Sequence, residues 1–162
     1  MTAAVRPALT EAFRAAFRGH PAGLAIVTAA GPDGPVGLTA SSVASLSAES
    51  PAVAFSLTRT GTTAAAVLAG GTALIHLLDA DDIALARRFA EPVDRFAAPT
   101  RWTALPTGEP WLADTGLALR CRVVSATDVG TSVLIAARIV EVLGARRGAH
   151  LVHVDRTHHV VT

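Results

Sequence analysis

The residues best suited to contact a ligand lie in a hydroxyl-rich stretch, Gly37-Leu-Thr-Ala-Ser-Ser-Val-Ala-Ser-Leu-Ser47. Side chains on a β-strand alternate between its two faces, so Thr39 and Ser41 share one face and Ser42 points to the other. Small side chains let a flat ligand approach the backbone closely, and hydroxyl groups both donate and accept hydrogen bonds. A solvated strand that happens to carry Ser and Thr explains the pattern equally well, so the stretch alone leaves both interpretations open.

A second hydroxyl-rich segment, Ser56-Leu-Thr-Arg-Thr-Gly-Thr-Thr63, leads directly into an alanine-rich stretch that we predict to be a helix. The N-terminus of a helix presents unpaired backbone N–H groups and a partial positive charge, and it therefore suits an anion. With Arg59 beside it, the segment offers the N–H, O–H and guanidinium donors that a phosphate group requires. Alternatively, Thr62 only caps the helix and Arg59 is a solvated charge, and the segment alone slightly favours this simpler interpretation.

Further polar side chains allow two weaker interpretations. Arg87 and Arg88, near the end of the next predicted helix, could reach a phosphate, although most such arginine pairs are simply solvated. A metal would need a defined set of ligands and supporting hydrogen bonds. Exposed or hydrogen-bonded histidines explain the C-terminal group better, and we predict no bound metal at its members, His153, Asp155, His158 and His159.

Composition narrows the classes of function. The chain of 162 residues fits one domain whose core needs neither a metal nor a disulfide. It contains no Lys, Tyr, Asn or Gln, which excludes a Schiff-base lysine and a tyrosine acid, and its one cysteine excludes a thiol-pair redox site. Its net charge of +1 predicts no general attraction to nucleic acid or to a membrane surface.

The distribution of apolar residues predicts a cytoplasmic protein that does not enter the membrane. The most apolar stretch, Ala64 to Leu78, is interrupted by Gly70-Gly71 and is shorter than the ~20 apolar residues of a membrane-spanning helix. The first residues, Met1-Thr-Ala-Ala-Val-Arg-Pro7, lack the apolar region of a signal peptide. The lone Cys121 cannot form an intrachain disulfide, and it fits a reducing compartment.

Strands outnumber helices in the pattern of apolar and turn residues. Gly31-Pro-Asp-Gly-Pro35 reads as a turn between two strands, which makes them a hairpin. Strands joined in this way indicate an antiparallel barrel or sandwich in a single domain, residues 1–162, in which residues 1–9 form a flexible arm. The predicted helices are Thr10–Arg18, Thr62–Gly70 and Asp79–Phe89, the predicted strands are Leu24–Thr28, Val36–Leu46, Ala52–Thr58, Thr72–Leu78, Leu117–Ala126, Ser132–Leu143 and Leu151–Val161, and Glu91–Pro110 is a loop packed by Trp102.

The order of four motifs resembles that of the flavin reductase family, whose members have the FMN-binding split-barrel fold. Each motif alone is weak, but together they run from about Phe13 to His159. The resemblance implies a mainly β protein, a Greek-key antiparallel split β-barrel with a few short flanking helices, which forms a homodimer with the flavin near the subunit interface. The motifs are Phe17-Arg-x-x-Pro-Ala-Gly-Leu-Ala-Ile-Val-Thr28, Gly37-Leu-Thr-Ala-Ser-Ser42 with Ser45-Leu-Ser47, Ala86-Arg-Arg-Phe-Ala90, and Asp155-Arg-x-x-His159.

The resemblance also implies roles for individual residues. Near the flavin ring and its ribityl chain it places Thr39, Ala40, Ser41 and Ser42, and near the phosphate it places Ser56, Arg59, Thr62 and Thr63. It implies that Arg88 and Phe89 close over the cofactor, and that Arg156 and His159 lie near the nicotinamide or the flavin ring, with His159 in the catalytic position.

Two departures from the family pattern concern the nicotinamide side. Many members have Gly-Asp-His where this chain has Gly130-Thr-Ser132, and many have Tyr where it has His158. The first departure removes an imidazole that the family associates with nicotinamide contact. The prediction of the flavin site is therefore firmer than that of the hydride-donor site.

These residues and the resemblance together predict an NAD(P)H:flavin oxidoreductase. It would transfer hydride from NADH or NADPH to FMN, or to FAD, and supply reduced flavin to a partner monooxygenase. The lack of a catalytic triad or carboxylate pair does not oppose this prediction, because hydride transfer is the chemistry of the cofactor. One alternative is a flavin-binding protein without this activity, either a flavin carrier or an FMN-dependent reductase of an organic substrate. Another is a barrel that serves only as an interaction module.

Overall fold

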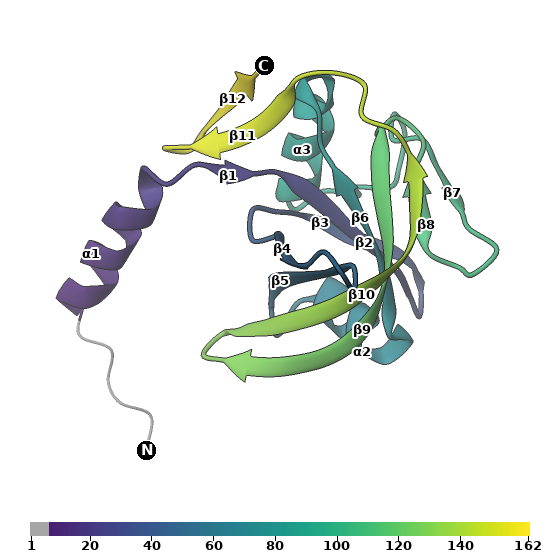
Figure 1. Ribbon diagram of the computed structural model, residues 1–162, viewed down its shortest axis with the longest axis horizontal. Helices are drawn as coiled ribbons and strands as arrows, with labels where there is room; N and C mark the ends of the chain where they lie inside the picture. The colour runs from purple at the N-terminus through teal and green to yellow at the C-terminus, as the bar shows by residue number, and fades with distance from the viewer. Residues whose placement is uncertain (1–6) are drawn as a thin grey trace.

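Seven antiparallel strands form the main sheet of the computed structural model, which describes residues 7–162 (Figure 1). Their order in the sheet is β3-β2-β6-β9-β10-β5-β4. The mainly β, antiparallel split-barrel architecture expected from the sequence is confirmed, and the barrel is not closed. The bounds are β2 Ala25–Gly31, β3 Gly34–Ala40, β4 Ala44–Ser47, β5 Ala52–Thr58, β6 Thr72–Leu77, β9 Leu117–Val129 and β10 Ser132–Gly144.

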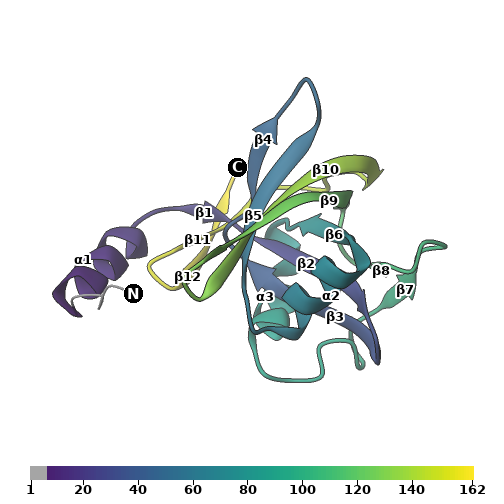
Figure 2. The same cartoon turned by 90° about the horizontal axis from the view of Figure 1, so that it is seen from below.

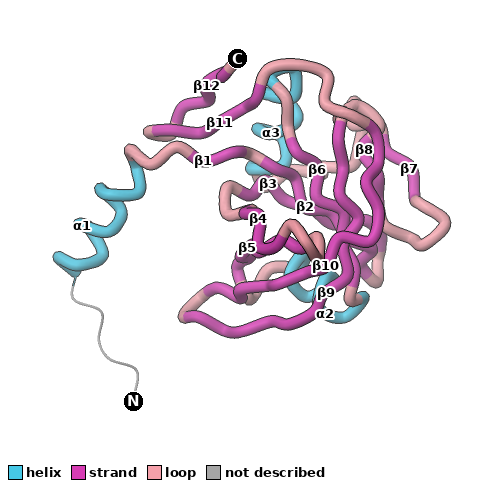
Figure 3. The backbone as a smooth tube through the Cα atoms, in the orientation of Figure 1, coloured by secondary structure: helices cyan, strands magenta, loops and turns pink. Residues whose placement is uncertain are grey.

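Two smaller sheets accompany the main one. The first consists of β1 (Ala22–Gly23), β11 (His150–Val154) and β12 (Thr157–Val161), in the order β1-β11-β12. The second pairs β7 (Trp102–Ala104), which lies inside the segment predicted to be a loop, with β8 (Pro110–Leu112), which starts at the last residue of that segment. Both β1 and β2 belong to the chain segment that follows the first helix, so this segment joins the small C-terminal sheet to the main sheet (Figure 3).

Three α-helices and one short 3-10 helix complete the described chain. They are α1 (Pro7–Arg18), α2 (Thr62–Gly70), η1 (Ala80–Asp82) and α3 (Ile83–Ala90). The helix α1 projects away from the rest of the chain in both views and has no buried residue (Figures 1 and 2). None of these helices in residues 7–162 has the length and apolar character needed to cross a bilayer.

The start of the chain differs from the sequence prediction. Residues 7–9, which we expected in a flexible arm, form the first turn of α1 instead, while residues 1–6 lie outside the described part of the chain. Within the described residues, the helix already includes Pro7, three residues before the predicted start at Thr10. The second helix begins as predicted at Thr62, but its N-cap residue is Gly61.

Two predicted strands are each divided in the structure. The predicted strand Val36–Leu46 is interrupted by Ser41, Ser42 and Val43, which separate β3 from β4. The predicted strand Leu151–Val161 is a hairpin, because the chain turns at Asp155 and Arg156, both of which have positive φ angles (48° and 61°). Neither interruption contains a glycine or a proline, the residues that most often mark a break in a strand, so the sequence did not reveal them.

The core has two parts, one on each side of β2. Inside the barrel, the larger apolar cluster includes Val27, Phe55 and Ile135 together with the buried face of α2. Beneath α3, the smaller cluster includes Ile26 and Phe89. Alternation along β2 explains the division, because Ile26 and Val27 point to opposite faces of the strand.

A buried histidine links three strands around the smaller cluster. His76 on β6 is fully buried, and its Nδ1 lies 3.1 Å from the backbone oxygen of Ile26. Its Nε2 accepts a hydrogen bond from the backbone N–H of Leu112 at 3.1 Å. Nδ1 therefore carries the proton, and burial lowers the pKa of His76 to about 4 despite the opposing hydrogen bond to Ile26. The ring is neutral and attaches β8 to the sheet.

Candidate functional site

A cavity of about 390 Å³ lies between β3 and β5, where the hydroxyl-rich segments of the sequence meet. Six of the predicted site residues line it, namely Thr39, Ala40, Ser41, Ser42, Ser56 and Phe89. Its other lining residues are Leu38, Leu57, Thr58, Ala90, Arg95 and Ser132. The structure thus brings together segments separated by more than ninety positions along the chain, from Leu38 to Ser132.

The cavity exists because β3 and β5 are not paired with each other. β2 is the sole neighbour of β3 in the described sheet, so the other edge of β3 is open. β4 pairs with Ala52, Val53 and Ala54 of β5 and leaves the following part of that edge open. The open edges of strands present rows of unpaired N–H and C=O groups. Where these groups are not bonded within the protein, the cavity wall offers backbone donors and acceptors to a ligand. The hydroxyls of Ser41, Ser56 and Ser132 add further polar groups to this wall.

Ser42 connects the two sides of this split. Its hydroxyl donates a hydrogen bond to the backbone oxygen of Ser56 at 3.0 Å and accepts one from the backbone N–H of Ser56 at 3.0 Å. Both bonds involve one residue of β5, so the side chain replaces a backbone partner at that position. The interruption after β3 is needed for this contact, because it turns Ser42 toward β5.

The outer face of β3 is attached to α3. The hydroxyl of Thr39 donates a hydrogen bond to the backbone oxygen of Ala86 at 2.6 Å. Phe89 is fully buried, and its ring lies against Gly37 so closely that a Cβ atom at Gly37 would be 3.1 Å from the ring. The side chain of Phe89 consequently supports the cavity wall from behind, and it does not lie over the cavity.

Arg95 was not predicted, and it brings a positive charge into the cavity. Its Nη1 donates to the backbone oxygen of Gly37 at 2.7 Å, and its Nε donates to the backbone oxygen of Glu91 at 3.0 Å. Among the residues that the structure describes, it is the single charged member of the cavity lining. A proline-rich loop carries no periodicity, so the sequence held no signal for the direction of this side chain.

Arg88 was predicted to close over the cofactor, but the structure shows it holding the loop that carries Arg95. Its Nη2 donates to the backbone oxygens of Asp94 at 2.7 Å and Ala97 at 3.1 Å. Longer contacts, both 3.4 Å, reach the backbone oxygens of Arg95 and Ala98. Arg88 does not line the cavity, and it acts on the cavity through the loop.

The predicted phosphate residues lie in different places. Arg59 follows Thr58, which lines the cavity, and its guanidinium pairs with Asp128 at 3.1 Å. Thr63 is buried with 2% of its surface exposed, which removes its hydroxyl from contact with a ligand at the surface. Thr62 lines a neighbouring groove. Of the four predicted phosphate residues, Ser56 is in the cavity lining and Arg59 is next to it.

The predicted nicotinamide residues do not line the cavity. Arg156 lies at the exposed turn of the C-terminal hairpin, and His159 is exposed on β12 opposite Val152. On the other face of the hairpin, the rings of His153 and His158 are 5.7 Å apart. Burial and, next, the positive charge of Arg87 on α3 lower the pKa of His158.

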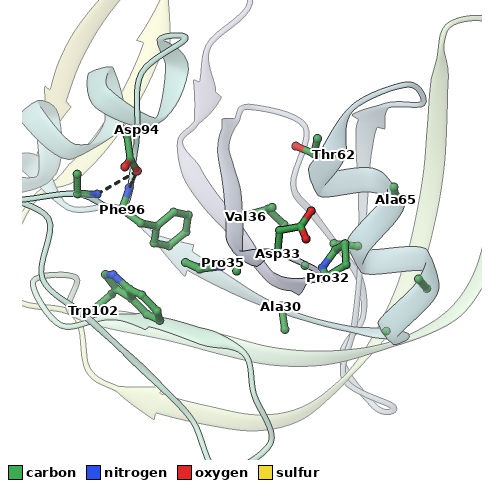
Figure 4. A pocket seen from close by; sticks show the side chains of 16 residues that line it. Ala30, Pro32, Asp33, Pro35, Val36, Thr62, Ala65, Asp94, Phe96 and Trp102 are labelled. Carbon is green, nitrogen blue, oxygen red and sulfur yellow. Dashed lines mark hydrogen bonds between the residues drawn. The ribbon is translucent and has the colours of Figure 1, made fainter.

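A larger groove of about 1020 Å³ lies on the other side of the loop that carries Arg95. Figure 4 shows Phe96 and Trp102 on one side of it, Thr62 on the opposite side, and Asp33 between them. Asp94 also lines this groove, and no basic residue of the described chain does. Two carboxylates without a cation disfavour a phosphate, so charge favours the smaller cavity as the site for a phosphorylated ligand.

Two of the four motifs found in the sequence, Gly37–Ser42 and Ala86–Ala90, contribute residues to the smaller cavity. Residues 17–162 match the model of the flavin reductase like domain. The chain belongs to the flavin reductase family. It is 40% identical over 131 residues to an NADH:FMN oxidoreductase of Rhodococcus erythropolis, covering 80% of this chain and 68% of the relative. It is 32% identical over 164 residues to the FMN reductase (NADH) RutF of Variovorax paradoxus, covering 99% of this chain and 91% of the relative.

Solved structures of flavin reductases share this fold. The flavin reductase domain protein from Arthrobacter sp. FB24 is 29% identical, with a TM-score of 0.89 over 94% of this chain and 96% of that chain. A putative flavin reductase from Haemophilus somnus is 26% identical, with a TM-score of 0.86 over 97% of this chain and 100% of that chain. The agreement covers nearly the full length of each of the two compared chains, so this chain shares the fold of these flavin reductases throughout.

Proposed function

We propose that the protein is an NADH-dependent flavin reductase that transfers hydride to FMN bound in the cavity between β3 and β5. One observation carries the proposal: β3 and β5 do not pair with each other, and the cavity between them is lined by small hydroxyl side chains and by Arg95. Relatives named NADH:FMN oxidoreductase and FMN reductase (NADH) support the reaction and the choice of NADH and FMN.

The chemistry of the cavity fits a flavin. The ring system of a flavin carries several hydrogen-bond acceptors and one donor along its edge, which complement unpaired backbone groups and hydroxyls. Ala40 and Ser41 provide little side-chain bulk, so a flat ring can approach the backbone of β3. The phosphate would lie at the end of the cavity near Arg59 and the start of α2, where a guanidinium and helix N–H groups are available.

When it is bound, the flavin supplies the hydride-accepting chemistry, and the protein supplies position and charge. Arg95 is the charged residue of the described lining, and its positive charge favours the reduced flavin, which carries more negative charge than the oxidised flavin. No carboxylate or imidazole of the described chain lines the cavity, and none is needed, since hydride transfer does not require an acid or base at the reacting atoms.

NADH would approach from the side of the C-terminal hairpin. Arg156 and His159 remain our candidates for contact with its nicotinamide or phosphate groups, and the exposed position of both side chains leaves them available. Ser132, which lines the cavity, occupies a position where many family members carry an imidazole. A serine hydroxyl can still donate a hydrogen bond to the carboxamide of a nicotinamide.

The activity is tested by mixing the purified protein with FMN and NADH without oxygen and following the loss of flavin absorbance. We expect acceleration over the uncatalysed mixture, and no acceleration with NADH or NADPH would refute the reductase activity. FMN that copurifies with the protein but is reduced by neither donor would instead support a flavin carrier or a reductase of an organic substrate.

A matched pair of variants tests the cavity itself. Arg95→Ala removes the charge in the lining, whereas Arg101→Ala removes an exposed arginine that pairs with Asp114 outside the cavity. Hydrogen bonds to charged groups contribute about 1.5–3 kcal/mol, so we expect Arg95→Ala to lower kcat/KM for FMN by roughly tenfold or more. Equal effects of the two substitutions would contradict the proposed site.

The homodimer expected from the sequence also remains a proposal, and the exposed face of α1 supports it. Leu9, Phe13 and Phe17 lie on one face of this helix and are 64%, 59% and 58% exposed. Large apolar side chains that gather on one face are typical of a protein interface. Light scattering should give twice the chain mass, and Phe13→Ser with Phe17→Ser should shift it toward the monomer, whereas Arg14→Ser should not.

We further propose that reduced flavin leaves the protein and serves a separate oxygenase in the cytoplasm. Ser41 and Ser42 are exposed at the edge of the cavity, which leaves a route for the flavin to exchange with solution. NADH is an intracellular donor, and the free thiol of Cys121 is compatible with a reducing compartment. Rapid dialysis of reduced flavin from the protein would support release, and retention through repeated dialysis would oppose it.

A further inference from the structure

An exposed ion pair joins Arg59, the residue after the cavity-lining Thr58, to Asp128 on β9. Nη1 of Arg59 donates a hydrogen bond to Oδ2 of Asp128 at 3.1 Å. The side chains are 51% and 61% exposed, so water reaches both of them. Within residues 7–162, the structure shows no second hydrogen bond from this guanidinium.

The backbone around this pair keeps it next to the cavity. Arg59 follows Thr58, and Asp128 lies opposite Val133 in the pairing of β9 with β10. Thr58 and Ser132, the respective sequence neighbours of Arg59 and Val133, both line the cavity. The backbone N–H of Arg59 donates to the backbone oxygen of Thr131 at 3.0 Å, which ties the two segments together. The backbone of Arg59 is therefore fixed one residue beyond the cavity lining, and its guanidinium is paired with Asp128.

We propose that Asp128 lowers the affinity for phosphorylated flavins by competing with the flavin phosphate for Arg59. The inference rests on the proposed function, since it assigns a ligand to the same cavity. An exposed ion pair held by one hydrogen bond is weak, because water screens the charges and both side chains lose freedom. A phosphate carries more charge and more acceptor oxygens than a carboxylate, so it can displace Asp128 from the guanidinium.

The same carboxylate also limits how tightly the phosphate is held. Once Arg59 has turned to the phosphate, Asp128 remains beside Arg59 without its partner and repels the phosphate charge. Both effects, the lost pair and the repulsion, act on FMN and FAD, and neither acts on riboflavin, which has no phosphate. Asp128 is thus a specificity-determining residue that keeps phosphorylated flavins exchangeable.

The test compares FMN with riboflavin in fluorescence titrations of the full chain. We expect Asp128→Asn to lower the Kd for FMN by about three- to tenfold while leaving the Kd for riboflavin within about twofold. Arg59→Ala should raise the Kd for FMN but not the Kd for riboflavin. In a chain that already carries Arg59→Ala, adding Asp128→Asn should lower the Kd for FMN by a smaller factor than it does in the wild-type chain. Increasing salt should reduce the difference between wild type and Asp128→Asn.

Asp33→Asn is the matched control, because it makes the same change in net charge at the β2–β3 turn, which lines the larger groove. Weaker FMN binding by Asp128→Asn, or equal gains for FMN and riboflavin, would overturn the competition. An equal gain in FMN affinity for Asp33→Asn would also overturn the competition. If wild type binds neither flavin, the proposed function fails; if it binds FMN and responds to Arg59→Ala but not to Asp128→Asn, only the role of Asp128 fails.

Discussion

The hydroxyl group of Ser42 makes two hydrogen bonds to the backbone of Ser56, one as donor and one as acceptor, each 3.0 Å long. They join the end of β3 to β5 at the position where the sheet lacks a ladder. The hydroxyl of Ser42, together with the adjacent pairing of β4 with β5, therefore closes this end of the ligand cavity. The contact between Ser42 and Ser56 is local, but it connects residues fourteen positions apart.

Ser42→Ala removes this connection and leaves the N–H and C=O groups of Ser56 without their partner. We expect the free energy of unfolding to fall by about 1 kcal/mol, because net protein hydrogen bonds contribute on this scale. We also expect weaker FMN binding, since the cavity can then widen. Urea denaturation and flavin titration measure the two effects. Ser41→Ala, at the exposed neighbouring position, should leave stability nearly unchanged, and similar losses in both variants would contradict the role of Ser42.

Gly37→Ala tests the close packing of α3 against β3. An added Cβ atom would lie 2.9 Å from the backbone oxygen of Val27 and 3.1 Å from the ring of Phe89, so the helix or the strand must move. Such overpacking costs about 1–3 kcal/mol. We expect a lower Tm and a higher Kd for FMN. Gly23→Ala, where a Cβ would contact nothing within 4 Å, is the control, and a comparable fall in its Tm would disprove the packing argument.

Arg88→Ala should release the loop that contains Arg95. The guanidinium donates to carbonyl groups of residues 94, 95, 97 and 98, so its removal leaves these groups to water and unties the loop. We expect faster amide hydrogen exchange across residues 91–98 and reduced FMN affinity. Arg87→Ala removes the adjacent, exposed arginine and should not change exchange in this loop. Unchanged exchange in Arg88→Ala would show that other contacts hold it.

The lowered pKa of His76 predicts how the free energy of unfolding depends on pH. Burial lowers its pKa in the folded chain to about 4, whereas the unfolded value is 6.5. The unfolded chain therefore binds the proton more readily between these values, and stability falls as the pH is lowered from 6.5 to 4. This difference between the folded and unfolded pKa corresponds to a loss of about 3 kcal/mol in the free energy of unfolding, at 1.36 kcal/mol per pKa unit.

His76→Gln provides the comparison for this pH dependence. A glutamine amide can donate to Ile26 and accept from Leu112 as the neutral imidazole does, and it does not titrate. The free energy of unfolding, measured at intervals from pH 7 to pH 4, should show a smaller slope in this variant than in wild type. Parallel slopes would mean that another group controls stability in this range.

Local patterns in the sequence predicted most strands and helices, but not the features that depend on distant contacts. β5, α2 and β6 agree closely with the segments predicted from apolar periodicity and flanking glycines. The break at Ser42 could not be predicted, because it follows from a contact with Ser56 across the sheet rather than from the residues on either side. Similarly, the hairpin turn at Asp155 lacks the glycine that usually marks a positive φ angle.

The sequence predicted only part of the candidate site, because the rest also depends on contacts between distant residues. Small hydroxyl residues on β3 indicated a ligand surface, and the structure places them in one cavity with Ser56. The direction of Arg95 depends on the path of an irregular loop held by Arg88, which no periodic pattern describes. Thr62 and Thr63 differ by one helical position, so one faces a groove and the other the core.

The single thiol of the chain, Cys121, is fully buried on β9, and burial raises its pKa to about 11. A protonated, enclosed thiol is a poor target for peroxide, because the thiolate is the reactive form and needs access to solution. Free reduced flavins react with oxygen and generate peroxide. An enzyme that releases such a product in air would therefore remain undamaged at its one cysteine, and its working lifetime would not depend on cellular thiol repair.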